Sequence, residues 1–198
     1  MRYVALGDSY TIGTCVREGE CFPNQLVAAL GGDAGSIQLV ANLGVNGYTS
    51  GDLIQHELPA LDGLRPELAS VLIGVNDVVL DVSPSAYELN VERILGTLLA
   101  RLAPDRIFTV AIPDYTVTPA GNDHGDPSRQ HDAIVTANAT MERRCREAGI
   151  AYVDTFDLSL RAAVDRTLVA GDGLHPSGAQ YALWVERMAP VVAGLLGH

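Results

Sequence analysis

Four short segments of the sequence contain residue types that could carry out acyl transfer. Residues 7–10 read GDSY, residues 42–50 read NLGVNGYTS, residues 74–77 read GVND and residues 172–176 read DGLHP. A serine hydroxyl such as that of Ser9 attacks a carbonyl carbon only when a base removes its proton. His175 could be that base, and Asp172 lies three residues before it, close enough to hold the imidazole in the required tautomer.

The two middle segments could stabilise the negative charge that develops during such an attack. The Asn76 side chain is a neutral hydrogen-bond donor, and glycines between residues 42 and 50 let the backbone approach a ligand closely. Each segment also has a simpler explanation when taken alone. Asp8 or Ser9 could cap a helix, the glycines fit an ordinary turn, and an Asn-Asp pair is common in turns. The combination of all four favours catalysis.

The elements that would position these residues alternate between strands and helices. Apolar runs predict strands at residues 3–6, 37–40, 70–73, 107–111 and 150–153, and their continuity is typical of strands buried on both faces. Helical spacing of apolar residues predicts helices at 22–30, 51–62, 84–102 and 129–148, and a last helix from Pro176-Ser177 that Pro190 breaks or kinks. Such alternation predicts one parallel sheet with helices on both faces.

Parallel sheets bind ligands outside the carboxyl ends of their strands. Three of the four segments directly follow predicted strands, and the fourth precedes the last helix. The irregular stretch at residues 113–128 is long for a loop in a compact domain, so we expect it to be functional. Tyr181 and Trp184 are expected in the core, and His56 and His198 at the surface.

Composition limits the kinds of partner. The chain has 198 residues, enough for one domain over residues 1–198, and a formal net charge of −11. This charge argues against binding to nucleic acid or to an anionic membrane. No apolar run has the length of a signal peptide or a membrane span, which predicts a soluble, cytoplasmic protein. Cys15, Cys21 and Cys145 are expected to be reduced, although Cys15 and Cys21 lie near enough in sequence to form a disulfide.

The order and spacing of the four segments resemble those of the SGNH hydrolases, also called GDSL-like esterases and lipases, from Gly7 to His175. The resemblance implies a three-layer α/β/α sandwich of flavodoxin-like type, with strand order 2-1-3-4-5. It implies Ser9 as nucleophile, an Asp172–His175 pair that completes the triad, and an oxyanion hole formed by Ser9, Gly47 and Asn76. Gly47 is preferred to Gly44 because Thr49 and Ser50 follow it closely. Tyr10 stands where many members have leucine, which could alter the pocket beside Ser9.

A serine ester hydrolase of this kind needs no cofactor and acts on a small-molecule ester. Short-chain carboxylic esters are the expected substrates, with acetylated carbohydrates, lysophospholipids and thioesters as alternatives; the oligomeric state stays open. An FMN-binding module is the main alternative from another class, since residues 9–14 are rich in hydroxyls. A further alternative is a metal site formed by Asp123, His124, Asp126, His131 and Asp132. Another is an inactive relative that serves as a binding protein.

Overall fold

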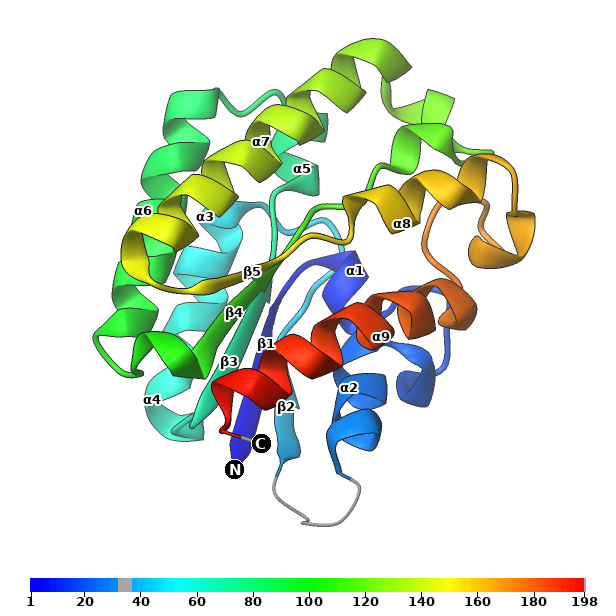
Figure 1. Cartoon of the computed structure of the whole chain (residues 1–198). Helices are drawn as coiled ribbons and strands as arrows, with labels where there is room; N and C mark the ends of the chain where they lie inside the picture. The colour runs from blue at the N-terminus through cyan, green and yellow to red at the C-terminus, as the bar shows by residue number, and fades with distance from the viewer. Residues whose placement is uncertain (32–36, 198) are drawn as a thin grey trace.

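The computed structural model describes residues 1–31 and 37–197, and within them five strands form one parallel sheet of order β2-β1-β3-β4-β5 (Figure 1). The strands span Arg2–Gly7 (β1), Gln38–Asn42 (β2), Leu68–Leu72 (β3), Ile107–Val110 (β4) and Ala151–Val153 (β5). The predicted sheet, the implied strand order and the α/β fold class are confirmed, and each strand lies within two residues of its predicted position.

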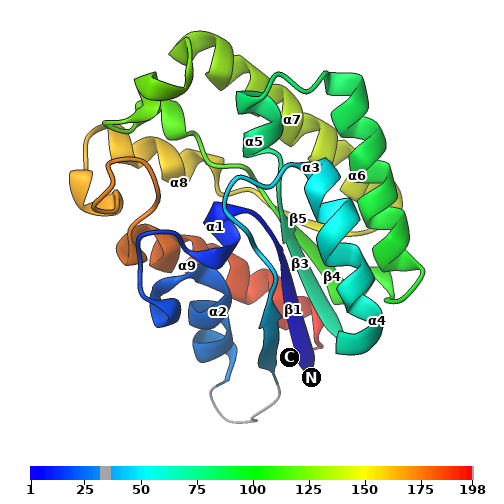
Figure 2. The same ribbon diagram turned by 180° about the vertical axis from the view of Figure 1, so that it is seen from behind.

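Helices cover both faces of the sheet and so form three layers (Figures 1 and 2). One face is covered by α2 (Phe22–Leu30) and α9 (Gly178–Leu195), which pack against each other. The other face carries α3 (Ser50–Asp52), α4 (Leu61–Leu64), α6 (Pro84–Leu99) and α7 (Pro127–Ala148). Three short helices directly follow β1, β3 and β5: α1 (Ser9–Ile12), α5 (Val75–Val79) and α8 (Phe156–Leu160).

The long helices begin at capping residues that the sequence supplies. Ser83 accepts a hydrogen bond from the Ala86 N–H at the start of α6, where Pro84 occupies the first turn. Asp126 does the same for α7 by accepting from the Arg129 N–H, so this helix starts two residues before its predicted position. Gly149 ends α7 in the left-handed conformation, at φ +70°.

Pro190 was predicted to break or kink the last helix. The break is wrong, because α9 continues through Pro190 to Leu195. A proline inside a helix costs about 3 kcal/mol. Pro190 lies on the exposed side, whereas Met188 and Val192 are fully buried against the sheet on either side of it. Burial of these two side chains keeps the helix intact past the proline.

The stretch predicted as a helix at residues 51–62 is interrupted. After α3 it forms a π-helical turn at Leu53–Glu57, a 3-10 turn at Leu58–Ala60, and then α4. Pro59 cannot donate a backbone hydrogen bond, which disfavours a continuous α-helix. The irregular path still buries Leu53, Leu58 and Leu61, and it also buries Glu57.

Large aromatic side chains fill the core between the sheet and the α2–α9 layer. Trp184 and Tyr181 are fully buried, as predicted, and their rings meet edge to face with centroids 5.1 Å apart. Strand β2 differs from its prediction because it is an edge strand whose residues are exposed or half-buried. His56 is exposed, as predicted, and His198 lies outside the described residues.

The three cysteines are free thiols. Cys15 is exposed, and Cys21 and Cys145 are buried. The alternative of a Cys15–Cys21 disulfide is therefore not formed in this structure.

Candidate active site

The register of the sheet brings the first and third segments together. Gly7 at the end of β1 pairs with Leu72 at the end of β3, so the residues that follow both strands emerge side by side at the carboxyl-terminal edge of the sheet. Ser9 then begins α1 and Asn76 lies in α5, and the two helices lie at this edge (Figure 1). The N–H of Val45, in the second segment, donates to the carbonyl of Gly7 over 3.2 Å and adds that loop to the same edge.

The turn that carries Ser9 is tightly constrained. Gly7 has φ +150°, and a Cβ at this position would lie 2.1 Å from the Leu72 carbonyl oxygen, closer than any real contact. Asp8 is fully buried and caps α1, with its Oδ1 accepting from the Tyr10 N–H over 3.0 Å. Ser9 begins the helix, so its own N–H has no partner inside that helix.

Asn76 is held by the loop that contains Gly47. Its Nδ2 donates to the carbonyl of Tyr48 over 2.9 Å, which leaves the second N–H of the amide free to donate elsewhere. Gly47 directly precedes Tyr48, is exposed, and has φ +82° in the left-handed region that favours glycine. The hydrogen bond therefore joins the Asn76 side chain to the residue that follows Gly47.

Asp172 and His175 form a hydrogen-bonded pair in the loop before α9. Asp172 Oδ2 lies 2.5 Å from His175 Nδ1, and its Oδ1 accepts from the backbone N–H groups of Leu174 and His175 at 3.0 Å each. Burial acts to raise the pKa of Asp172, but these hydrogen bonds outweigh it and lower the pKa to about 2. The ionised carboxylate holds the proton on Nδ1 and leaves Nε2 as the acceptor. Cys15 also hydrogen-bonds to Asp172, which raises the pKa of the thiol.

Ser9, Asn76 and His175 line one hollow of about 180 Å³, together with Tyr10, Val75, Val79, Tyr115, His124 and Leu174. Asp172 lies behind His175, and Gly47 is not part of the lining. Within residues 1–31 and 37–197, no direct hydrogen bond joins the Ser9 side chain to His175. Such bonds are often long in ligand-free enzymes and shorten when substrate binds.

This arrangement of predicted site residues can be compared with known proteins. A family model described as the GDSL-like Lipase/Acylhydrolase family matches residues 5–183. The chain belongs to this family. It is accordingly a carboxylic-ester hydrolase of the GDSL type, which confirms the resemblance drawn from the four segments. A comparison with curated protein sequences finds no match.

Solved structures share the fold of this GDSL-type chain. The crystal structure of TesA aligns with a TM-score of 0.79 at 18% identity, covering 98% of this chain and 99% of that one. The esterase EstA from Pseudoalteromonas sp. aligns with a TM-score of 0.74 at 16% identity, covering 100% and 99%. The acetylxylan esterase Axe2 from Geobacillus stearothermophilus aligns with a TM-score of 0.73 at 20% identity, covering 100% and 94%.

Two lining residues of the hollow were not predicted as pocket residues: Tyr115 was not singled out, and His124 was considered only as a metal ligand. Both belong to the irregular stretch at residues 113–128, which folds into 3-10 turns at Tyr115–Val117 and Gly121–His124. Their rings lie edge to face, 5.7 Å apart. Burial raises the pKa of Tyr115 to about 12, so the phenol keeps its proton. The unusual length of the stretch was the one sequence signal that pointed to this role.

The residues considered as a metal site have separate roles in the structure. Asp126 caps α7, His124 packs against Tyr115, and His131 Nδ1 lies 2.6 Å from Asp114 Oδ2. In residues 1–31 and 37–197 no three His, Cys, Asp or Glu side chains gather where they could hold a metal ion. The same residues contain no helix that is both long and apolar enough to span a bilayer.

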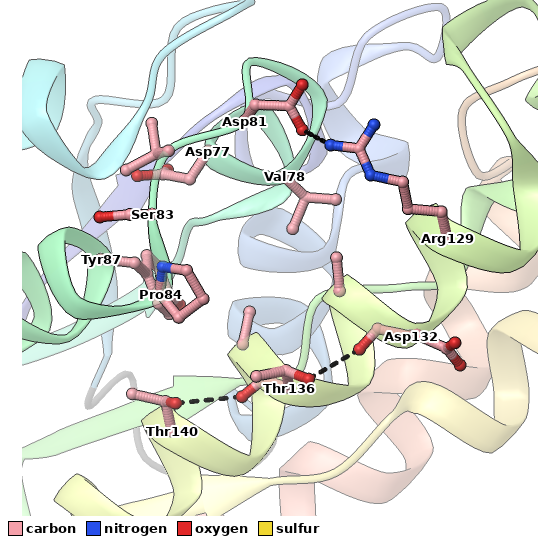
Figure 3. Close-up of a pocket in the computed structure, with 13 residues that line it drawn as sticks. Asp77, Val78, Asp81, Ser83, Pro84, Tyr87, Arg129, Asp132, Thr136 and Thr140 are labelled. Atoms are coloured by element: carbon pink, nitrogen blue, oxygen red, sulfur yellow. Dashed lines mark hydrogen bonds and ion pairs between the residues drawn. The ribbon is translucent and has the colours of Figure 1, made fainter.

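A larger hollow, of about 360 Å³, lies on another side of α5 (Figure 3). Arg129, Asp132, Thr136 and Thr140 of α7 line one of its sides, and Val78, Pro84 and Tyr87 line the other. Arg129 forms an ion pair with Asp81 at this hollow. Since Ser9, Asn76 and His175 do not line it, the smaller hollow is the better candidate for the active site.

Proposed function

We propose that Ser9, His175 and Asp172 form a catalytic triad that hydrolyses short-chain carboxylic esters through an acyl-enzyme. His175 Nε2 accepts the Ser9 proton as the hydroxyl oxygen attacks the ester carbonyl carbon. The protonated imidazole then gives that proton to the leaving alcohol as the C–O bond breaks. Water attacks the acyl-enzyme in a second, equivalent cycle and releases the acid. These steps require no metal or organic cofactor.

Three donors would stabilise the tetrahedral oxyanion in this proposal. They are the backbone N–H groups of Ser9 and Gly47 and the Nδ2 of Asn76. Support comes from the unpaired position of the Ser9 N–H at the start of α1 and from the Asn76–Tyr48 hydrogen bond, which holds the amide in place. One such donor contributes on the order of 10²–10³ in rate, or roughly 2.7–4 kcal/mol.

The observation that carries the proposal is the Asp172–His175 pair beside Ser9. The 2.5 Å contact to Nδ1 fixes the tautomer in which Nε2 is a base, and His175 and Ser9 line the same hollow. A carboxylate with a lowered pKa also favours the imidazolium that forms during attack. A histidine with only a structural role does not require an unprotonated Nε2. Here that nitrogen belongs to a residue that shares a hollow with Ser9, which begins α1.

The size and lining of the hollow support a small acyl group. Its volume of about 180 Å³ is below the range of roughly 300–1,000 Å³ typical of pockets for drug-sized ligands. Val75, Val79 and Leu174 supply apolar contacts, and His124 supplies a polar group. EstA was crystallised inhibited by monoethylphosphonate, and Axe2 is an acetylxylan esterase. Esters of acetate with polar alcohols, acetylated carbohydrates included, are therefore the second candidates.

A panel of p-nitrophenyl esters with acyl chains from two to sixteen carbons tests the substrate class. We expect kcat/KM to be highest for chains of about two to four carbons, because longer chains exceed the hollow. Acetylated sugars and acyl-CoA thioesters run beside them distinguish the alternatives. A maximum at sixteen carbons would contradict the short-chain proposal, and the Ser9→Ala protein measures activity that does not use the triad.

A further inference from the structure

Beneath the turn that carries Ser9 lies a second acidic side chain to which no role has been given so far. Glu57 ends the π-helical turn at Leu53–Glu57 and is 3% exposed. Its Oε2 accepts a hydrogen bond from the Gly7 N–H over 2.9 Å, across 50 residues of sequence. Gly7 is two residues before Ser9, so this bond connects the irregular helix directly to the turn of the nucleophile. Single π-helical turns are frequent at functional sites.

Glu57 has a buried acidic neighbour in Asp8. Asp8 is fully buried, and one oxygen of each carboxyl, Asp8 Oδ2 and Glu57 Oε1, is buried without a hydrogen-bond partner. The other oxygen of each carboxyl holds a backbone N–H of the same turn, that of Tyr10 or Gly7. The two carboxyls therefore fix the backbone before Ser9, at Gly7, and after it, at Tyr10.

Acidic groups dominate the electrostatic surroundings of this pair. Burial is the main cause that raises the pKa of Glu57 to about 9, and the nearby Asp8 carboxyl raises it further. Burial also raises the pKa of Asp8 to about 8, with a smaller contribution from Asp77. Within residues 1–31 and 37–197, no salt bridge joins Asp8 or Glu57 to a cationic side chain. Asp52 of α3 accepts from Thr49, and Arg93 of α6 lines a separate surface hollow with Ile54 and Leu58.

A pair of buried carboxyls without a compensating cation cannot both be ionised at low cost. We propose that Glu57 is a positioning residue that works as a neutral carboxylic acid: it accepts the Gly7 N–H through one oxygen and so fixes the turn that presents Ser9 to the substrate. The inference rests on the proposed role of Ser9. It adds that activity falls at alkaline pH when Glu57 ionises beside the Asp8 carboxylate, because both buried groups are then charged and their repulsion displaces the turn.

Two substitutions separate a neutral acid from a charged one. Glu57→Gln keeps an oxygen for the Gly7 N–H and carries no charge at any pH, whereas Glu57→Leu removes the acceptor. We expect Glu57→Gln to keep most of the wild-type kcat near pH 7. Glu57→Leu should lower kcat about ten- to a hundredfold with little change in KM, since a small displacement of the nucleophile has effects of this size. Gln55→Ala, an exposed change in the same turn, is the matched control and should leave both constants unchanged.

The pH profile of kcat provides the readout that a merely structural residue would not move. It is measured from pH 6 to 10 on a p-nitrophenyl ester with background hydrolysis subtracted. The wild type should lose activity at alkaline pH, and in Glu57→Gln that decline should move upward by about half a pH unit or more, or disappear. This comparison needs only the Gln variant and so decides the matter even if Glu57→Leu does not fold.

The proposal is overturned if Glu57→Gln loses as much kcat as Glu57→Leu, if folded Glu57→Leu keeps the wild-type kcat, or if the alkaline limbs of wild type and Glu57→Gln coincide. Its failure is distinguishable from failure of the proposed triad. A fully active Ser9→Ala protein would reject the triad, whereas any of the three Glu57 outcomes would leave the role of Ser9 intact.

Discussion

Among single residues, Asn76 has the role that kinetics can isolate most clearly. Its amide is held by the Tyr48 carbonyl in the ligand-free protein, and its second N–H is available to the developing oxyanion. A donor that gains strength only in the transition state raises kcat rather than lowering KM.

Replacing Asn76 by alanine should therefore reduce kcat on the order of 10²–10³-fold and leave KM within a few-fold, because the oxyanion would lose one of its three proposed donors. The measurement is steady-state kinetics on a short-chain p-nitrophenyl ester. Asn24→Ala, the same change on α2, should show wild-type constants. A larger KM with unchanged kcat would mean that Asn76 binds substrate and does not act on the transition state.

The sequence predicted the residues of the site unevenly. Ser9, Asn76, Asp172 and His175 lie in segments with recognisable spacing, and the structure brings Ser9, Asn76 and His175 to one hollow with Asp172 bonded to His175. Tyr115, His124 and Glu57 have no such spacing. Their positions depend on how an irregular loop and a π-helical turn pack against distant strands, which periodicity cannot predict.

At the level of elements, the junction between β1 and α1 determines where Ser9, the proposed nucleophile, lies. Gly7 has φ +150°, and a Cβ added there would lie 2.1 Å from the Leu72 carbonyl oxygen and 2.3 Å from Thr11 Oγ1. Any side chain at this position would displace the backbone that leads to Ser9.

Gly7→Ala should lower the free energy of unfolding by roughly 2 kcal/mol or more, since both the backbone conformation and the steric contact are unfavourable for alanine. Urea denaturation followed by circular dichroism measures the change. Gly63→Ala in α4 is the control, because its Cβ would have no neighbour within 4 Å and alanine favours a helix. Equal stability of the two variants would contradict this account of the turn.

Prediction of the elements succeeded where local patterns agree with packing. The five strands and the start of α6 follow from apolar runs and from the Ser83-Pro84 pair, whereas α7 starts two residues before its predicted position because Asp126 caps it. Prediction failed at two places: a helix expected at residues 51–62 is interrupted, and a break expected at Pro190 does not occur. Pro59 contributes to the interruption of a helix that periodicity alone favoured, whereas burial of Met188 and Val192 preserves a helix that proline alone should end.

For the whole molecule, stability should depend on pH with a sign set by its buried acids. Glu57 and Asp8 have pKa values of about 9 and about 8 in the folded protein, above those of an unfolded chain. The folded state therefore binds more protons between about pH 4 and pH 9, and the stability from these groups is lost as pH rises through that range. Asp172, whose pKa is lowered to about 2, acts in the opposite direction below about pH 4.

Removing one of these acids should flatten the profile. The free energy of unfolding of wild type relative to Glu57→Gln should fall between about pH 5 and pH 9, by an amount on the order of a few kcal/mol. Urea titrations at a series of pH values provide both curves. Parallel curves over this range would show that Glu57 has the same pKa in the folded and unfolded states.

The arrangement of the whole molecule followed from the sequence in two ways. Alternating strands and helices predicted the layered sheet, and the resemblance to GDSL-type hydrolases supplied the strand order, which alternation cannot determine. Strand β2 was predicted to be buried on both faces because its composition matches the other strands. Its place at the edge of the sheet, which leaves it partly exposed, is a property of topology rather than of local sequence.

The most direct test of the account is to identify the side chain that forms a covalent bond with a fluorophosphonate ester. The probe reacts with a serine whose hydroxyl is activated by a base, and peptide mass spectrometry locates the adduct. The proposed triad predicts one adduct, on Ser9, that disappears in Ser9→Ala and forms much more slowly in His175→Ala. An adduct on another serine, or equal labelling of the Ser9→Ala protein, would contradict it.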